Sequence, residues 1–449
     1  MASGRFIAWA AIGLLWVLAV WHSWASRGLF VDGSKLLIDM VRYDWFVTFR
    51  GPRFHTEVAN QILPVIGIRL GVTDLHLLAR LLSFDLFGVP TLFYSLALWR
   101  AHRDAVLLAA ALAAVAIVFM TTSFFIVGEY NTAYALTVMG AVWLATSDRL
   151  RLADGIVLLG VACFFSRSYE VTLFLGPIMA AMTCWRVATA ASQSRIASAV
   201  YVAAGLLFLG GMFVAVGSLL QPFDPEHLQA TYLELGYFWW NLQFDLACAA
   251  AAVVVVWALV RPDGLGRLTP FLWASFFLAL LALSPLLAMA DFDVQPTARS
   301  QYISRFAGGA VVAAIVLFLW AHAAGLHRKL PALAMLRRPD VGRRFLVFAA
   351  LLLAAGVPID LQLTAGWLHY LDTLKSIVRT HTGVVAIEDT ALARKPDLLL
   401  VENWSMPSQS LVLRSKPGDG VVAPFRWYTG WSPFPPESPL DLGSYAWRD

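Results

Sequence analysis

The sequence predicts an all-α polytopic membrane protein with about eleven transmembrane helices and a small α+β unit at its C-terminal end. Of its 449 residues, 59% are hydrophobic and only 14% are charged, whereas soluble proteins carry about 25% charged residues. The mean hydropathy is +0.69, and apolar runs of membrane-spanning length recur along the chain. This composition excludes a soluble enzyme, a nucleic-acid-binding module and a disordered scaffold, although the formal net charge is +4.

The first apolar run is longer and bulkier than the core of a signal peptide, so we interpret it as an uncleaved helix. Ten further runs follow it, and two of them, at residues 155–165 and 171–185, are short for a bilayer crossing. The predicted spans are residues 6–25, 77–98, 105–125, 130–146, 155–165, 171–185, 196–219, 238–260, 269–290, 303–325 and 345–358.

Basic residues between the spans predict the orientation. With the N-terminus in the cytoplasm, every inward connector is basic, as the positive-inside rule requires. An odd number of spans then places residues 359–449 outside the membrane, and we expect a bacterial inner membrane. The three cysteines lie in apolar runs, so no disulfide is expected. The inward connectors contain Arg100 and Arg103, Arg149 and Arg151, Arg186 and Arg195, Arg261 and Arg267, and Arg328 to Arg344.

Two regions outside the spans are large. Residues 26–76 have apolar residues at helical spacing and predict two amphipathic helices along the membrane surface. The tail begins with an amphipathic stretch at 361–378 and continues with a segment rich in proline and tryptophan. We therefore expect a membrane domain at residues 1–360 and an outer domain at residues 361–449. Short strands are predicted in the tail at residues 383–387, 398–401, 410–413 and 420–422.

A more specific pattern follows the first span. An acidic residue in Phe30–Gly33 (FVDG) opens a surface helix that ends in Tyr43–Trp45 (YDW), and a loop passes through Arg53–His55 (RFH). The next span opens with Leu78–Ser83 (LARLLS), and a later connector reads Phe164–Ser168 (FFSRS). In this order the chain resembles the GT-C superfamily of membrane glycosyltransferases, in its protein O-mannosyltransferase and aminoarabinose-transferase branch. Asp-Gly stands where that branch has an acidic pair.

The resemblance implies a GT-C-like fold and a sugar transfer at the outer face. Enzymes of this class move a sugar from a polyprenyl-phosphate carrier to an acceptor hydroxyl. The expected partners are therefore a lipid-linked sugar donor, a glycolipid, glycan or protein acceptor, and membrane lipids, with no nucleic acid.

Such a reaction needs a base for the acceptor hydroxyl. The resemblance points to Asp32, whereas its position before a helix is also that of a stabilising N-cap, and both roles are compatible. Glu129 lies at the edge of a span, where an acid is costly unless it is paired or functional. We rank Glu129 as a second acid that orients the acceptor, with an interface anchor as the alternative.

The leaving phosphate needs cations, and arginine suits it because its planar guanidinium offers several donors. The alternative for arginines at span ends is contact with lipid headgroups. The candidates for the phosphate are Arg167, Arg299, Arg305, Arg80 and Arg53. The candidates for the acceptor groove are His55, Tyr302, Trp239 and Trp240.

The motif Asp291-Phe292-Asp293 resembles a DxD metal site, but a short acidic loop produces it by chance. We therefore favour a metal-independent reaction, with a divalent ion at Asp291 and Asp293 as the alternative.

Two other functions remain open. An O-antigen ligase or polymerase also uses lipid-linked sugars, but that class lacks the acidic residue and the surface helices after the first span. A flippase or other transporter usually has repeated halves and polar groups at the membrane midplane, and the sequence contains no internal repeat.

Overall fold

The computed structural model describes residues 2–48, 51–122, 128–192, 194–220, 242–260, 297–326, 339–394 and 405–424. These residues are predominantly helical. The α-helices are α1 (Ala2–Trp24), α2 (Asp32–Tyr43), α3 (Phe54–Ala59), α4 (Ile62–Arg69), α5 (Leu75–Ala101), α6 (Ala105–Ala114), α7 (Glu129–Thr146), α8 (Leu152–Phe165), α9 (Thr172–Thr189), α10 (Arg195–Leu220), α12 (Leu242–Val260), α14 (Thr297–Ala323), α15 (Pro339–Thr380) and α16 (Met406–Leu413).

Shorter elements connect these helices. A π-helical turn, Val115–Phe119, and a 3-10 turn, Met120–Thr122, continue α6. Other 3-10 turns are η1 (Arg27–Leu29), η2 (Gly51–Arg53), η9 (Ile387–Asp389) and η10 (Ala391–Arg394). Strands β1 (Arg149–Leu150) and β2 (Ala191–Ser192) form one parallel pair, and β3 (Val384–Ala386) and β4 (Val421–Ala423) form another.

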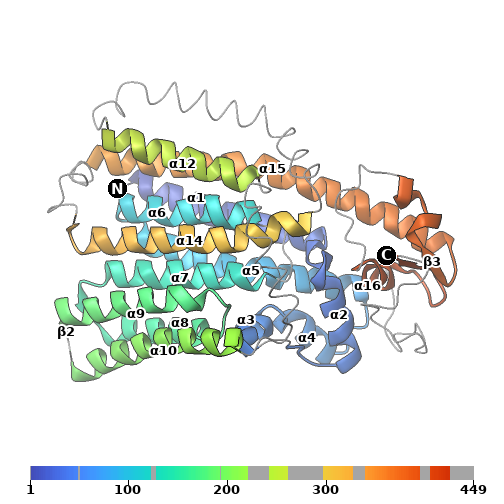
Figure 1. Ribbon diagram of the computed structural model, residues 1–449, viewed down its shortest axis with the longest axis horizontal. Coiled ribbons are helices and arrows are strands. Elements are labelled where there is room, and N and C mark those ends of the chain that lie inside the picture. The colour runs from blue at the N-terminus through green and yellow to red at the C-terminus, as the bar shows by residue number, and fades with distance from the viewer. Residues whose placement is uncertain are drawn as a thin grey trace.

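The long helices lie side by side along the long axis of the molecule (Figure 1). Helix α5 packs against α1 and α7, α10 packs against α8 and α9, and α15 packs against α6. The helices α2, α3 and α4 lie at one end of this bundle, which we call the α2 end. The strands β1 and β2 and the first residues of α1 lie at the opposite end, which we call the β1 end (Figure 1).

Helices occupy nearly all the described residues of ten of the eleven predicted apolar runs, the run at residues 269–290 lies outside the described residues, and the number of membrane spans stays a prediction. Five helices in the described part are long and apolar enough to cross a membrane. The chain is therefore a helical protein of membrane type. The five helices are Gly4–Trp24, Leu75–Ala101, Ala105–Thr122, Arg195–Leu220 and Asp340–Thr380.

The C-terminal region differs from the prediction in two respects. The predicted strand at residues 410–413 is wrong, because these residues belong to the buried helix α16. The sequence of a short apolar run does not distinguish a strand from a buried helix. Pro407 lies in the first turn of α16, where proline favours the start of a helix. The last predicted span and the predicted amphipathic stretch form one continuous 42-residue helix, α15, with Pro358 inside it. The domain boundary predicted at residue 360 therefore falls within a helix.

The first surface region also differs in detail. The apolar face of α2 points into the protein, since Leu36, Leu37 and Met40 are all buried. The second predicted helix is divided into α3 and α4 by Asn60 and Gln61. The side-chain amide of Gln61 accepts a hydrogen bond from the Val47 amide at 2.8 Å and donates one to its carbonyl oxygen at 2.7 Å. These two bonds fix the chain between α2 and α3.

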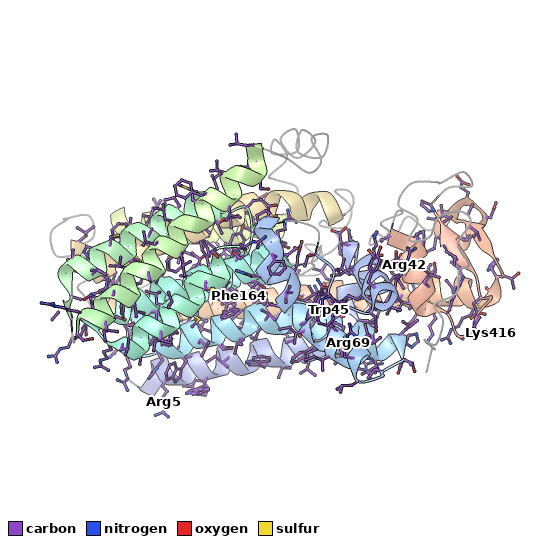
Figure 2. The ribbon with its side chains drawn as sticks, turned by 90° about the horizontal axis from the view of Figure 1, so that it is seen from below. Arg5, Arg42, Trp45, Arg69, Phe164 and Lys416 are labelled. Carbon is purple, nitrogen blue, oxygen red and sulfur yellow. The ribbon has the colours of Figure 1, made fainter. Side chains whose placement is uncertain are left out.

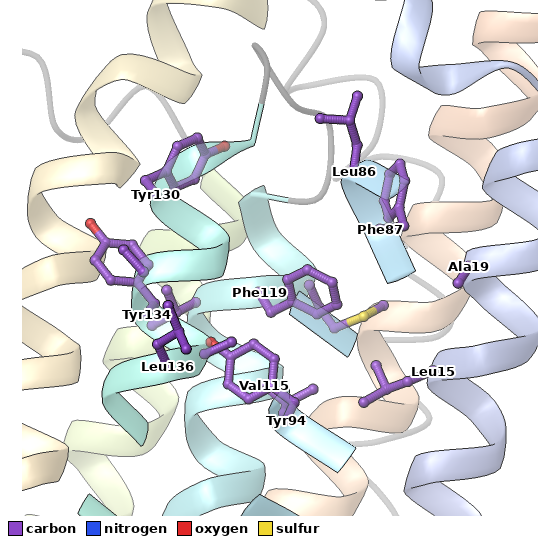
Figure 3. Close-up of a cluster of buried hydrophobic side chains, with 14 of the residues drawn as sticks. Leu15, Ala19, Leu86, Phe87, Tyr94, Val115, Phe119, Tyr130, Tyr134 and Leu136 are labelled. Atoms are coloured by element: carbon purple, nitrogen blue, oxygen red, sulfur yellow. The ribbon is translucent and has the colours of Figure 1, made fainter. Parts of the chain in front are cut away.

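Aromatic and aliphatic side chains fill the centre of the bundle (Figure 3). The rings of Tyr94 on α5 and Phe119 on the π-helical turn lie 5.4 Å apart. The rings of Tyr130 and Tyr134 on α7 lie 6.1 Å apart in an edge-to-face arrangement. Edge-to-face contacts of this kind stabilise a packed core beyond the area that they bury.

A buried ionic group joins the end of α1 to the middle of α15. The guanidinium of Arg27 donates to Asp360 Oδ1 at 2.8 Å and to Thr364 Oγ1 at 3.0 Å. The Nε2 atom of His22 lies 2.6 Å from Asp360 Oδ2. Burial lowers the pKa of Arg27, and the nearby Asp360 opposes this shift. The ring of Phe87 lies 5.1 Å from the guanidinium carbon and covers the group on the α5 side.

The Asp360→Asn variant should lose about 3–5 kcal/mol of unfolding free energy, because it removes the negative charge that pairs with the buried Arg27. The matched control is Asp340→Asn on the same helix, where the exposed Asp340–Arg344 pair at 3.0 Å should contribute at most about 1 kcal/mol. Loss of helical circular dichroism on heating in detergent measures both. Equal unfolding temperatures for the two variants would contradict a stabilising role of the buried pair.

Candidate functional site

Two segments that are far apart in the sequence meet at the α2 end. Residues 51–56, which comprise η2 and the start of α3, contact the turn between α8 and α9. The Thr56 hydroxyl donates to the Ser168 carbonyl oxygen at 2.6 Å, and the His55 amide donates to the Arg167 carbonyl oxygen at 3.0 Å. This junction brings together four of the predicted site residues, namely Arg53, His55, Glu129 and Arg167.

Arg53 is the centre of the junction. Its Nε atom lies 2.8 and 3.0 Å from the two carboxylate oxygens of Glu170, and its Nη1 lies 3.9 Å from Glu129 Oε1. The ring of Tyr169 lies 4.6 Å from the guanidinium carbon. Burial alone would lower the pKa of Arg53, but Glu170, Tyr169 and Glu129 together raise it above the ordinary value. We call Arg53, Glu129, Tyr169 and Glu170 the Arg53 cluster.

Glu129 is the first residue of α7 and is only 4% exposed. Its Oε2 atom is buried and has no hydrogen-bond partner among the described residues. The hydroxyl oxygen of Thr132, one turn further along α7, is also buried without a hydrogen-bond partner among the described residues. A buried carboxylate oxygen without a donor is unfavourable, so this atom is suited to accept a hydrogen bond from a ligand hydroxyl.

His55 and Arg167 are held by backbone and aromatic contacts. The Nδ1 atom of His55 lies 3.1 Å from the Phe164 carbonyl oxygen, and its ring stacks on Phe164 with the centroids 6.1 Å apart. Arg167 donates from Nε to the Gly51 carbonyl oxygen at 2.8 Å, and its guanidinium carbon lies 4.9 Å from the Phe54 ring. Among the described residues no carboxylate pairs with Arg167. In Figure 2, Phe164 lies closer to the long helices of the bundle than Trp45 and Arg69 do.

Asp32 is the first residue of α2, and the N-cap position itself belongs to Val31. An acid in this first turn is favoured by the helix dipole, and the side chain is partly exposed. Val31 has a φ of 52°, a conformation that costs a β-branched residue about 1–3 kcal/mol. Strain directly before a candidate base is typical of functional loops, where the surrounding structure enforces it.

The structure also gives a physical reason for the Asp-Gly sequence. A Cβ atom added to Gly33 would lie 1.7 Å from the Gly28 carbonyl oxygen. A second acidic side chain therefore cannot follow Asp32 in this backbone conformation. On the other side of the same turn, the Gly28 amide donates to Ser83 Oγ on α5 at 2.9 Å.

The other predicted site residues are not brought to this junction by any described contact. Arg80 is exposed, and its carbonyl oxygen accepts a hydrogen bond from Ser23 Oγ at 2.8 Å. His322, near the end of α14, lies 3.1 Å from Asp104 at the β1 end, so the first turns of α14 point toward the α2 end. Arg299, Tyr302 and Arg305 belong to those turns, but their side chains lie outside the described part, as do Trp239, Trp240, Asp291 and Asp293 entirely.

The DxD motif therefore stays a prediction. Within the described ranges, no group of three or more His, Cys, Asp or Glu side chains is placed to hold a metal ion.

Sequence reasoning missed the partners of the predicted residues. Tyr169 and Glu170 directly follow the Arg167 connector, and an acid at the edge of a span was the signal that could have identified Glu170. Asp360 follows the last predicted span by two residues, and its partner Arg27 lies 333 positions away. No local pattern connects such a pair.

Comparison with known proteins returns no match, because no protein-family model, no curated protein and no solved structure is significantly similar to this chain.

The Gly33→Ala variant should destabilise the protein by about 1–3 kcal/mol, because its methyl group must displace the Gly28 backbone. The control is Gly13→Ala in α1, where an added Cβ meets no atom within 4 Å and helix propensity favours alanine by about 1 kcal/mol. Thermal unfolding in detergent should separate the two. The tight turn would be contradicted if Gly33→Ala were as stable as Gly13→Ala.

Proposed function

We propose that this protein is a GT-C-type glycosyltransferase that moves a sugar from a polyprenyl-phosphate carrier to an acceptor hydroxyl. The observation that carries the proposal is the junction at the α2 end. There the loop containing Arg53 and His55, the acid Glu129 and the Arg167 turn meet, which is the grouping that the GT-C resemblance implies. Asp32, the first residue of α2, lies at the same end of the bundle (Figure 1).

The proposal includes eleven membrane spans in a bacterial inner membrane, with the N-terminus in the cytoplasm and the reaction at the outer face. The distribution of basic residues supports this orientation. Arg5 lies at the β1 end (Figure 2), and the basic connectors between α5 and α6, α7 and α8, and α9 and α10 lie there also. At the α2 end, Tyr43, Trp45 and Leu70 are more than half exposed, as expected of side chains at a membrane interface.

In the proposed reaction, Asp32 takes the proton of the acceptor hydroxyl as general base. The acceptor oxygen forms a bond to the anomeric carbon of the sugar, and the bond from that carbon to the phosphate oxygen breaks with inversion. The polyprenyl phosphate leaves with the bonding electron pair. General-base assistance supplies about 10²–10⁴-fold in rate, and cations stabilise the charge that develops on the phosphate.

The contacts of Arg53 and Arg167 support different roles for these residues. Arg53 is paired with Glu170 and Glu129, so its charge is already compensated, and we assign it to holding the two acids in place. Arg167 is half-buried and is bonded through Nε to a backbone carbonyl. We assign Arg167 to the donor phosphate, together with Arg299 and Arg305. Glu129 receives the acceptor hydroxyl at its buried Oε2 atom.

The charged residues that meet at the junction support the transferase over a transporter, although Asp85 on α5 and Asp245 on α12 lie within predicted spans. Glu129, Arg53 and Arg167 meet at the α2 end, and the buried Asp360 carboxylate is paired with His22 and Arg27 within the bundle. A transport path would require ionisable groups along the depth of the membrane.

The Asp32→Asn variant should lower transfer by about 10²-fold or more, because it cannot accept the hydroxyl proton. The test is mass spectrometry of lipid-linked sugars and envelope glycans in a deletion strain that expresses each variant at equal level. Asp44→Asn, at the other end of α2, is the matched control, since its φ of 56° suits asparagine. Full restoration of the glycan by Asp32→Asn would exclude the catalytic-base role.

The Glu129→Gln variant should raise the KM for the acceptor about tenfold, because a charged acceptor of the hydroxyl hydrogen bond becomes a neutral one. Thermal stability should change little, since Arg53 keeps its two bonds to Glu170. The glycan found by mass spectrometry in the deletion strain identifies the acceptor. Initial rates measured against the concentration of that acceptor then give the KM. The control is Thr137→Val on the same helix, because the Thr137 hydroxyl bonds to the Ala133 carbonyl oxygen of its own helix. A Glu129→Gln enzyme with wild-type KM would exclude this acceptor site.

A further inference from the structure

The loop that carries Asp32 depends on contacts from outside its own sequence. We define the Asp32 loop as residues 25–34, between α1 and the first turn of α2. Two of its non-glycine residues, Ser26 and Val31, have positive φ angles of 51° and 52°. Such conformations persist only where the surroundings enforce them.

One set of contacts comes from the part of α15 beyond Asp360. The indole of Trp367 donates to the Ala25 carbonyl oxygen at 3.0 Å. Its ring also meets Phe30 edge-to-face, with centroids 5.8 Å apart and an interplanar angle of 88°. Trp367 and Phe30 are fully buried, so these contacts hold both ends of the segment that contains Arg27.

A second set comes from α16. The side-chain amide of Gln409 donates to the Leu29 carbonyl oxygen at 3.2 Å. Its Oε1 atom accepts a hydrogen bond from the Tyr370 hydroxyl at 2.6 Å. Both side chains are completely buried, so α15, Gln409 and the Asp32 loop form one chain of hydrogen bonds. The Ser34 hydroxyl adds a longer contact of 3.5 Å to the Ser405 carbonyl oxygen.

We propose that Gln409 is a positioning residue that fixes the Asp32 loop, and therefore the Asp32 carboxylate, through the Leu29 carbonyl oxygen. The contact from Tyr370 orients the Gln409 amide so that its nitrogen faces the loop. In this way α15 and α16 set the geometry of a group that lies more than 300 residues earlier in the chain. The effect of this arrangement on catalysis rests on the proposed function, whereas the fixing of the loop by Gln409 does not.

The test compares Gln409→Met with wild type in detergent. Hydrogen exchange should accelerate about tenfold or more at the amides of residues 27–33, because opening of the loop then breaks fewer bonds. Displacement of Asp32 should lower kcat for sugar transfer at least about tenfold, with the donor KM unchanged. The control is Ser410→Ala, which removes the buried acceptor of a 3.0 Å hydrogen bond that the Val422 amide donates to Ser410 Oγ and takes no part in the described hydrogen bonds of the Asp32 loop.

A double variant separates positioning from general stability. Gln409→Met removes the oxygen that accepts the 2.6 Å hydrogen bond from the buried Tyr370 hydroxyl, and Tyr370→Phe removes that hydroxyl while keeping the ring next to Trp367. The double variant should therefore recover thermal stability but keep the fast exchange at residues 27–33 and the low kcat. Recovery of all three properties would overturn the positioning role.

The two proposals fail in different ways. Unchanged exchange at residues 27–33 in Gln409→Met overturns the positioning by Gln409, even if Asp32→Asn abolishes transfer. Fast exchange with wild-type kcat overturns the catalytic purpose of that contact. If Asp32→Asn transfers the sugar as well as wild type does, Asp32 is not the general base of the proposed function. Hydrogen exchange at residues 27–33 then still tests whether Gln409 holds the loop.

Discussion

The buried pair of Arg27 and Asp360 is the interaction on which the α2 end depends. Its atoms lie 2.8 Å apart with almost no exposure, where an unpaired charge would be strongly unfavourable. The end of α1 and the middle of α15 are therefore held together in one register. The segment of α15 beyond Asp360 can then reach the loop after α1, and this segment carries the tryptophan that binds the Ala25 carbonyl oxygen.

The candidate residues belong to two groups with separate supports. The Asp32 loop is held by α5, α15 and α16, whereas the Arg53 cluster is held by the turn between α8 and α9. Because loops at the end of a helical bundle have few backbone bonds of their own, side chains from distant helices must satisfy them. The separate supports mean that damage to one group should leave the geometry of the other intact, which makes the roles of Asp32 and Glu129 separable by experiment.

Hydropathy was sufficient for the long helices and insufficient for the contacts between them. Helices such as α5 and α10 follow from long apolar runs alone. Residues 410–413 predict a strand but belong to the helix α16, because so short an apolar run holds too little periodicity. Pro358 hides the continuity of α15. In the site, the motifs point to Arg53 and the position at a span edge points to Glu129, but neither signal is used for Glu170 or Asp360. Their importance lies in pairing with arginines that are far away in the sequence.

The contacts of the two arginines at the junction also restrict how a phosphate can bind there. Arg53 lies between two carboxylates, so this cluster carries one more negative than positive charge and repels a phosphate at short range. Arg167 is bound to the same loop through the Gly51 carbonyl oxygen and keeps its charge uncompensated by any described carboxylate. A donor phosphate beside Arg167 and a hydroxyl beside Glu129 satisfy both groups. The electrostatics of the junction therefore favour separate places for the leaving group and the acceptor, as a transfer with inversion requires.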